Sequence, residues 1–323
     1  MEQRQSITRI AGVDIGKRHL DAAVHGLEDV VRVENTEAGV SELIAWLKVR
    51  EVGRVGLEAS GGYERRLHSA LAQAGLEVVV HQPIEVRRFA QLKRWRAKND
   101  RQDARLIAAA TAQVDAVKAA QDPRLADLAE RLTAYEQVTD QIATLKTFLE
   151  SVRLKDILKL LRVQIRNLES LKAKLAADIL RRIKAEPDLL ARFRLLLTLP
   201  GFGPIVAATA VVRMPELGSM QRGQAASLLG VAPFDRDSGQ WKGLRFIQGG
   251  RATVRAVLYM ATLVATKRNA MIRAFDQRLV TAGKPKKLVL VACMRKLLTM
   301  RNAIAQSRLP WSVDTAYGVL TTA

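Results

Sequence analysis

ITRIAGVDIGKRHLDAAV, residues 7–24, decides the fold of the N-terminal part of this chain. It begins with a β-branched run that ends in Gly16, and a second apolar run follows after a short basic turn. A third run, DVVRVEN at residues 29–35, comes after another short turn. We therefore predict three neighbouring β-strands at the start of the fold.

After these strands the pattern changes to an alternation of helix and strand. GVSELIAWLKVRE has helical periodicity, RVGLEA reads as a strand, and YERRLHSALAQAG, EVVVHQ and PIEVRRFAQLKRW continue as helix, strand and helix. A further helix is predicted at about Asp100 to Thr111. Three strands followed by this alternation predict a mixed sheet covered by helices, so we expect an α/β domain over residues 1–123.

The rest of the chain is predicted to be mainly helical. The 63 residues between Pro123 and Pro187 contain neither glycine nor proline, which predicts long helices and a coiled-coil segment over residues 124–190. Their apolar stripe fits a hairpin packed on its own chain as well as an intermolecular coiled coil, and the sequence leaves both open. Residues 191–323 form the third predicted domain, in which LLLTLPGFGPIVAATAVVR is typical of a helix-hairpin-helix.

The charge of the chain points to a polyanionic partner. Its 52 Lys and Arg against 32 Asp and Glu give a net charge of +20, and residues 187–323 alone carry 20 bases against 6 acids. No apolar run is long enough to cross a membrane, and the start lacks the apolar core of a signal peptide. One cysteine, Cys293, predicts a packed core thiol in a reducing compartment, and the histidines and cysteine form no zinc pattern. We expect a soluble, cytoplasmic protein without membrane partners.

Four carboxylates stand where a metal site could form. Asp14 and Glu58 end two predicted strands, and Asp100 and Asp103 lie three residues apart on one predicted helix face. Two Mg²⁺ ions need this density of hard oxygen ligands, and Mn²⁺ is a possible substitute. The alternatives are structural: a turn cap, an ion pair with arginine, or acids at the positive end of a helix.

Three places in the sequence are candidates for contacts with nucleic acid. The glycine turn of the predicted helix-hairpin-helix offers backbone amides to a phosphate, and a basic run lies beside the helix that carries the two aspartates. Basic side chains also flank a polar, glycine-bearing loop at residues 234–250, where Ser238 is a candidate nucleophile or a plain turn residue. The candidate binding residues are Arg94, Arg96, Lys98, Arg101, Gly201, Gly203, Lys242, Arg245, Arg251 and Arg255.

Seven segments in order resemble the IS110/IS1111 family of insertion-sequence transposases over nearly the whole chain. They are AGVDIGKRHLD, LEASGGYE, KNDRQDARLIA, LTLPGFGPIVAATAV, LLGVAPFDRDSGQWKG, GGRATVRAVLYMATLVA and GKPKKLVLVACMRKLL. The resemblance implies an N-terminal RuvC-like domain of RNase H fold, a helical coiled-coil insert and a C-terminal transposase domain. It also implies roles for individual residues, with a DEDD metal-binding set at Asp14, Glu58, Asp100 and Asp103, and a serine at Ser238.

The resemblance further implies the reaction and the partners. The expected activity is Mg²⁺-dependent DNA cleavage and rejoining through a covalent phosphoserine, guided by a structured noncoding (bridge) RNA that pairs with donor and target DNA. A homodimer or homotetramer held by the long helices, acting at the nucleoid, is the expected assembly.

Two other functions are compatible with the sequence. One is a RuvC-like nuclease or junction resolvase that hydrolyses DNA without a serine nucleophile, and the other is a non-catalytic protein that binds RNA or bridges DNA. Ser60, close to Glu58 in the sequence, is an alternative nucleophile, although a serine before Gly-Gly is more simply a turn residue.

Overall fold

The structure is a computed structural model that describes residues 9–95, 100–115, 122–235, 243 and 245–312, without the side chains of residues 100, 101 and 222. The chain divides into two compact units, residues 1–121 and 122–323, which are described separately below.

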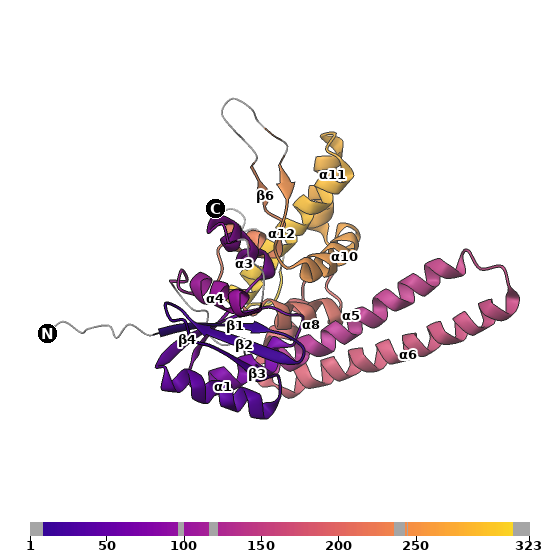
Figure 1. Ribbon diagram of the computed structural model, residues 1–323. Coiled ribbons are helices and arrows are strands. Elements are labelled where there is room, and N and C mark those ends of the chain that lie inside the picture. The colour runs from indigo at the N-terminus through magenta and orange to yellow at the C-terminus, as the bar shows by residue number, and fades with distance from the viewer. Residues whose placement is uncertain (1–8, 96–99, 116–121, 236–242, 244, 313–323) are drawn as a thin grey trace. The chain divides into compact units, whose positions relative to one another are not determined.

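The N-terminal unit is built on a five-stranded mixed sheet of order β3-β2-β1-β4-β5 (Figure 1). The first three strands pair antiparallel, whereas β4 and β5 run parallel to β1. The strands are β1 Arg9–Ile15, β2 His19–Val24, β3 Val30–Glu34, β4 Val52–Glu58 and β5 Glu77–His81. The mixed sheet predicted from the sequence is therefore confirmed.

Helices cover both faces of this sheet, and the two faces differ in composition. The helices are α1 Glu37–Val49, α2 Glu64–Gln73, α3 Pro83–Leu92 and α4 Asp100–Thr111. Alternate residues such as Val13, Leu20 and Leu57 pack in one apolar cluster with residues of α1 and α2. Since side chains alternate along a strand, the residues between them face the other side, which α4 covers.

Two glycines on the sheet allow α4 to pack closely against it. A Cβ atom at Gly12 would lie 2.2 Å from the Ala108 backbone nitrogen and 2.4 Å from the Ala104 carbonyl oxygen. A Cβ atom at Gly56 would lie 1.8 Å from the Thr111 hydroxyl oxygen. Because Gly12 and Gly56 are register partners on β1 and β4, α4 lies directly on the backbone of the two central strands.

The second unit is mainly helical. Its helices are α5 Pro123–Leu149, α6 Lys155–Ala185, α7 Pro187–Leu197, α8 Pro204–Arg213, α9 Arg222–Leu229, α10 Ala252–Arg268, α11 Ala270–Thr281 and α12 Lys286–Ser307. A short antiparallel ribbon, β6 Pro233–Phe234 with β7 Phe246–Ile247, flanks the stretch that the sequence predicts as a plain loop. No helix within the described residues is both long and apolar enough to span a membrane.

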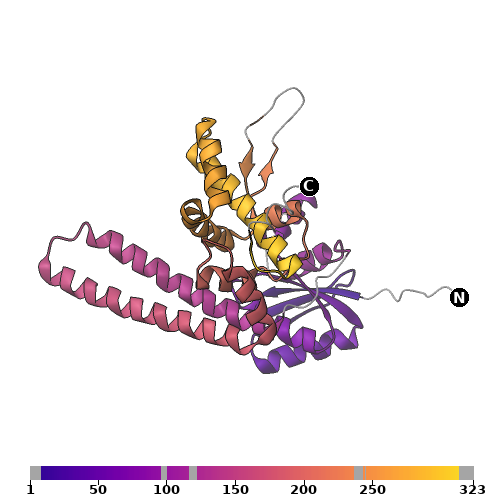
Figure 2. The same cartoon turned by 180° about the vertical axis from the view of Figure 1, so that it is seen from behind.

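The breaker-free segment forms a hairpin of α5 and α6, which lie side by side in Figures 1 and 2. Val138 and Ile142 of α5 form an apolar cluster with Ile165 and Leu168 of α6. The two helices therefore form a hairpin on their own chain, and an intermolecular coiled coil stays a prediction. The predicted three-part domain division, with residues 124–190 as a segment of their own, stays a prediction.

Candidate active site

One row of polar residues crosses the whole N-terminal sheet on the α4 face. Asp21 is the register partner of both Arg32 on β3 and Asp14 on β1, and Glu58 is the register partner of His81 on β5. Since Val13 pairs with Leu57, Asp14 lies beside Glu58 on the adjacent parallel strand. In strand order the row therefore reads arginine, aspartate, aspartate, glutamate, histidine.

The sequence predicts Asp14 and Glu58 as metal ligands. They lie next to one another on adjacent strands, and the backbones of adjacent strands are about 4.8 Å apart. Both follow a glycine by two residues, so they share the face on which α4 packs. Both are partly buried and each has an interaction within the protein. The strand ends that the sequence picks out are therefore brought together.

The other two predicted ligands lie at the start of α4. Asp103 directly precedes Ala104, whose carbonyl lies against Gly12, two residues before Asp14. Asp103 is partly buried and is engaged within the protein, while the side chain of Asp100 lies outside the described part. Among the side chains that the structure describes, no three acids, histidines or cysteines are close enough together to hold a metal ion. The donor chemistry nevertheless fits Mg²⁺, which prefers carboxylate oxygens.

Asp21 is a functional-site neighbour that the sequence analysis missed. It is 3% exposed and accepts hydrogen bonds from Arg32 Nε, at 3.0 and 3.1 Å, and from Arg32 Nη2, at 2.9 Å. This bidentate pair neutralises the Asp21 carboxylate directly beside Asp14. Directly opposite like charges on neighbouring strands destabilise a sheet, so Arg32 makes the acidic row tolerable.

We expect Arg32→Met to destabilise the N-terminal unit more than Asp21→Asn does. The methionine leaves a charged carboxylate almost fully buried without its partner, and we expect a loss of about 2 kcal/mol because the arginine itself is half exposed. Urea unfolding of both variants measures this. Asp29→Asn, which removes an exposed pair with Arg50, is the control, and equal losses for Arg32→Met and Asp29→Asn would contradict the assignment.

His81 ends the polar row and fastens α4 to β5. Its Nε2 atom lies 2.9 Å from the Thr111 hydroxyl, which itself donates to the Ile107 carbonyl oxygen at 2.7 Å. The hydroxyl proton is therefore used, so Nε2 donates to the hydroxyl oxygen. Burial lowers the pKa of His81, against the opposing effect of Glu85, so the imidazole beside Glu58 is neutral at pH 7.

The side chain of Glu64 fixes the loop after Glu58 by hydrogen bonds. Glu64 accepts hydrogen bonds from the Ser60 hydroxyl at 2.9 Å and from the amides of Ser60 and Gly62 at 3.0 and 2.9 Å. Burial opposes ionisation of this carboxyl, but these hydrogen bonds outweigh it and lower the pKa of Glu64. Ser60 is therefore engaged in shaping a turn, as its Gly-Gly context predicts.

Three candidate arginines of the second unit form ion pairs or hydrogen bonds within the protein. Arg251 forms an ion pair with Glu216 at 2.6 Å, and Arg245 pairs with Asp235 at 2.5 Å. Arg255 donates to the Gly249 carbonyl oxygen at 2.6 Å. These arginines brace the base of the loop at residues 234–250.

Several candidates fall outside what the structure describes, and others lie at the edges of elements. Arg94 is exposed just after α3 and has a φ of 53°. Ser238, Arg96, Lys98 and Lys242 lie outside the described residues, as does the side chain of Arg101.

The glycine turn lies between α7 and α8. Gly201 has a φ of 104°, and a Cβ atom there would lie 2.8 Å from Ala265 Cβ on α10, so this glycine serves close packing. Gly203 caps α8, and a Cβ atom there would meet nothing within 4 Å. The Gly201 position is therefore closed to a side chain and the Gly203 position is open, and the contact of both glycines with a phosphate stays a prediction.

Comparison with known proteins decides the family. A model of DEDD transposases of the IS110 type matches residues 11–159, and a model of the transposase IS116/IS110/IS902 family matches residues 193–277. The chain belongs to the IS110 family of transposases. The two matches reach into both units, and the first spans all four DEDD positions, three of which have described side chains.

Two relatives of this IS110-family chain are named for the inversion of a gene. The pilin gene-inverting proteins of Moraxella bovis and Moraxella lacunata are each 28% identical over 321 residues, covering 93% of this chain and 96% of theirs. A solved structure of RuvC from Thermus thermophilus is similar at 17% identity and a TM-score of 0.26, over 34% of this chain and 99% of that one. That likeness is too slight to argue from.

The sheet topology and the element order confirm the predicted α/β N-terminal unit and the largely helical remainder, and the RuvC-like fold stays an expectation from the family resemblance. The protein is a transposase or recombinase of the IS110 family.

Proposed function

We propose that this IS110-family transposase cuts and rejoins DNA through a covalent phosphoserine. The observation that carries the proposal is the placement of Asp14 and Glu58 side by side on the sheet face covered by α4. The first turn of that helix holds Asp100 and Asp103. Carboxylates from two central strands and one helix supply the oxygen ligands that phosphoryl transfer requires.

The proposed cofactor is Mg²⁺, with two ions per site and Mn²⁺ as a substitute. When bound, Mg²⁺ would polarise the scissile phosphate and stabilise charge on the oxygens that attack and leave. The proposed ligands are Asp14, Glu58, Asp100 and Asp103. Asp21, the fifth acid of this region, is not among the proposed ligands, because Arg32 neutralises it in a bidentate ion pair.

The proposed nucleophile is Ser238. Its Oγ atom forms a bond to phosphorus while the bond between phosphorus and a deoxyribose oxygen breaks. The serine hydroxyl loses its proton and the leaving deoxyribose oxygen gains one. One phosphoester replaces another without hydrolysis, so the reverse step can rejoin the strand to a new end.

The proposed partners are donor and target DNA and a noncoding guide RNA. Base pairing between the RNA and each DNA would choose the sites, so the protein needs mainly backbone contacts, to which its charge of +20 is suited. Candidates for these contacts are Arg94, Arg96, Lys98, Arg101, Gly201, Gly203, Lys242, Arg245, Arg251 and Arg255. A dimer or tetramer acting at the bacterial nucleoid in the cytoplasm completes the proposal.

The test is reconstitution with purified protein, Mg²⁺, labelled donor DNA that carries the element junction, and RNA transcribed from the flanking noncoding end. We expect protein-linked DNA on a denaturing gel only when both RNA and Mg²⁺ are present. Adduct formation without RNA would contradict RNA guidance, and free cleaved ends without any adduct would favour a RuvC-like nuclease.

A further inference from the structure

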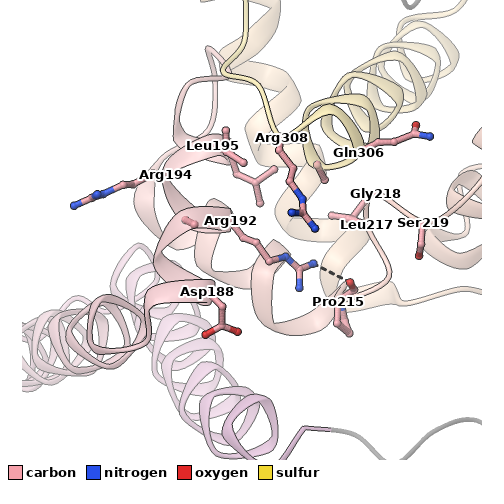
Figure 3. A pocket seen from close by; sticks show the side chains of 13 residues that line it. Asp188, Arg192, Arg194, Leu195, Pro215, Leu217, Gly218, Ser219, Gln306 and Arg308 are labelled. Carbon is pink, nitrogen blue, oxygen red and sulfur yellow. Dashed lines mark hydrogen bonds between the residues drawn. The ribbon is translucent and has the colours of Figure 1, made fainter.

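A cavity of about 860 Å³ in the second unit is lined by three arginines and one aspartate (Figure 3). It lies between α7, the loop at residues 214–219 and the end of α12. Its walls are mostly aliphatic, with Leu195, Leu196 and Leu217 among them. In Figure 3 the guanidinium groups of Arg192 and Arg308 point toward one another, whereas Arg194 points away.

Arg192 is a partly buried cation without an acidic partner. Its Nη2 atom donates to the Pro215 carbonyl oxygen at 2.8 Å, and within the described part of the chain no carboxylate lies within ion-pair distance of it. Burial lowers the pKa of Arg192, against the opposing effects of Asp188 and Glu216. A guanidinium kept partly dehydrated in this way gains from an anion brought by a ligand.

Two acids lie near Arg192, and each forms an ion pair with another arginine. Asp188, four residues before it on α7, accepts from Arg124 at 3.0 and 3.1 Å. Glu216 pairs with Arg251 at 2.6 Å. Arg124 is shared with Asp122 and Glu186, so Asp188 still weakens the positive field in the cavity. The lining nevertheless holds three arginines against this one acid and is net positive.

Arg308 occupies a backbone conformation that normally favours glycine. It follows the last turn of α12 with a φ of 57°, and its amide donates to the Ile304 carbonyl oxygen at 3.0 Å. An arginine at this position is strained, and strained residues gather at functional sites. The side chain that this conformation directs toward Arg192 is the second cation of the cavity.

The wall opposite α7 is fixed before any ligand arrives. Gly218 has a φ of 99°, and its amide donates to Asn302 Oδ1 at 2.9 Å. The Asn302 side chain also donates to the Met220 carbonyl oxygen at 2.7 Å, and a Cβ atom at Gly218 would lie 2.9 Å from the Ala305 backbone. A preorganised wall lowers the entropic cost of binding.

We propose that this cavity binds a phosphodiester group of single-stranded nucleic acid, with Arg192 and Arg308 on the phosphate and the aliphatic wall against the attached nucleoside. Guanidinium forks match phosphate oxygens, and the volume suits one nucleotide unit. Residues 187–323 carry 20 bases against 6 acids, which favours a nucleic acid over an acidic peptide. The inference rests on the proposed function, because the guide RNA and the opened DNA are the single strands that such an enzyme meets.

The test compares two charge-matched double variants of the full chain, Arg192→Gln with Arg308→Gln in the cavity and Arg268→Gln with Arg273→Gln at exposed positions outside it. Fluorescence anisotropy with labelled 12-nucleotide single-stranded RNA, single-stranded DNA and duplex DNA, in 150 mM salt without divalent metal, gives the dissociation constants. We expect the cavity variant to bind single strands at least about tenfold more weakly and the control at most about threefold more weakly, because only the first loses bound phosphate. Comparison of the losses with single-stranded RNA and with single-stranded DNA shows which of the two the cavity binds.

Three outcomes would overturn the inference. Equal losses in the two double variants would mean that only overall charge matters, and a loss confined to duplex DNA would exclude a single-strand site. Unchanged affinity with a changed mass by light scattering would make the cavity a protein contact. Arg308→Gln alone, on an exposed side chain, keeps the test valid if the double variant fails to fold. Adduct formation by the wild type is measured separately, so loss of the cavity inference leaves the proposed function standing.

Discussion

Ser238→Ala will abolish the covalent protein–DNA adduct while leaving the affinity for DNA and RNA within about twofold of the wild type. The alanine lacks the Oγ atom that is proposed to form the bond to phosphorus, so no phosphoester to this residue can form. The loss is therefore complete rather than partial. The adduct is measured on a denaturing gel with labelled donor DNA, and the affinities by anisotropy.

The matched control is Ser60→Ala. Ser60 lies two residues after Glu58, but its hydroxyl donates to Glu64 and shapes the turn. We expect this variant to keep forming the adduct. Loss of the hydrogen bond to Glu64 can displace the loop after Glu58, so we allow a rate up to about tenfold below that of the wild type. If the adduct still forms in Ser238→Ala and does not form in Ser60→Ala, the nucleophile is Ser60 and the proposal is contradicted.

Asp14→Asn will lower the rate of DNA cleavage at least about 10³-fold, which corresponds to about 4 kcal/mol of transition-state stabilisation. The substitution keeps the shape of the side chain and removes its charge at the centre of the polar row, beside Glu58 and opposite Asp21. Single-turnover cleavage at saturating Mg²⁺ measures the effect.

Asp29→Asn is the control for Asp14→Asn, because it also removes one negative charge from the N-terminal unit at an exposed position. We expect it to cleave DNA at the wild-type rate. Asp14→Asn must also unfold at the same temperature as the wild type within a few degrees. Cleavage by Asp14→Asn at more than a tenth of the wild-type rate would assign Asp14 a structural role.

The sequence predicts the sheet and part of the acidic row for a physical reason. Strand periodicity shows where β1 and β4 end, and carboxylates at the ends of apolar strands stand out. Asp14 and Glu58 are therefore found from the sequence and are neighbours in the structure. The breaker-free segment likewise predicts α5 and α6, although periodicity alone cannot tell a hairpin from an intermolecular coiled coil.

Features that depend on register or on contacts across long separations stay hidden in the sequence. The alignment of Asp21 with Asp14 and Arg32 requires the strand register, which the sequence does not give. The cavity brings Arg192 and Arg308 together from helices that are far apart in the chain. The β6–β7 ribbon has only two residues in each strand, too few for any periodicity.

The central claim is tested most directly by identifying the residue that becomes linked to DNA. Protein from the reconstituted reaction is digested with protease and nuclease, and the peptide that carries a nucleotide is sequenced by mass spectrometry. The account predicts a phosphoester on Ser238, formed only with Mg²⁺ and absent from Asp14→Asn. A nucleotide on any other residue, or cleaved DNA with no nucleotide-bearing peptide, would contradict it.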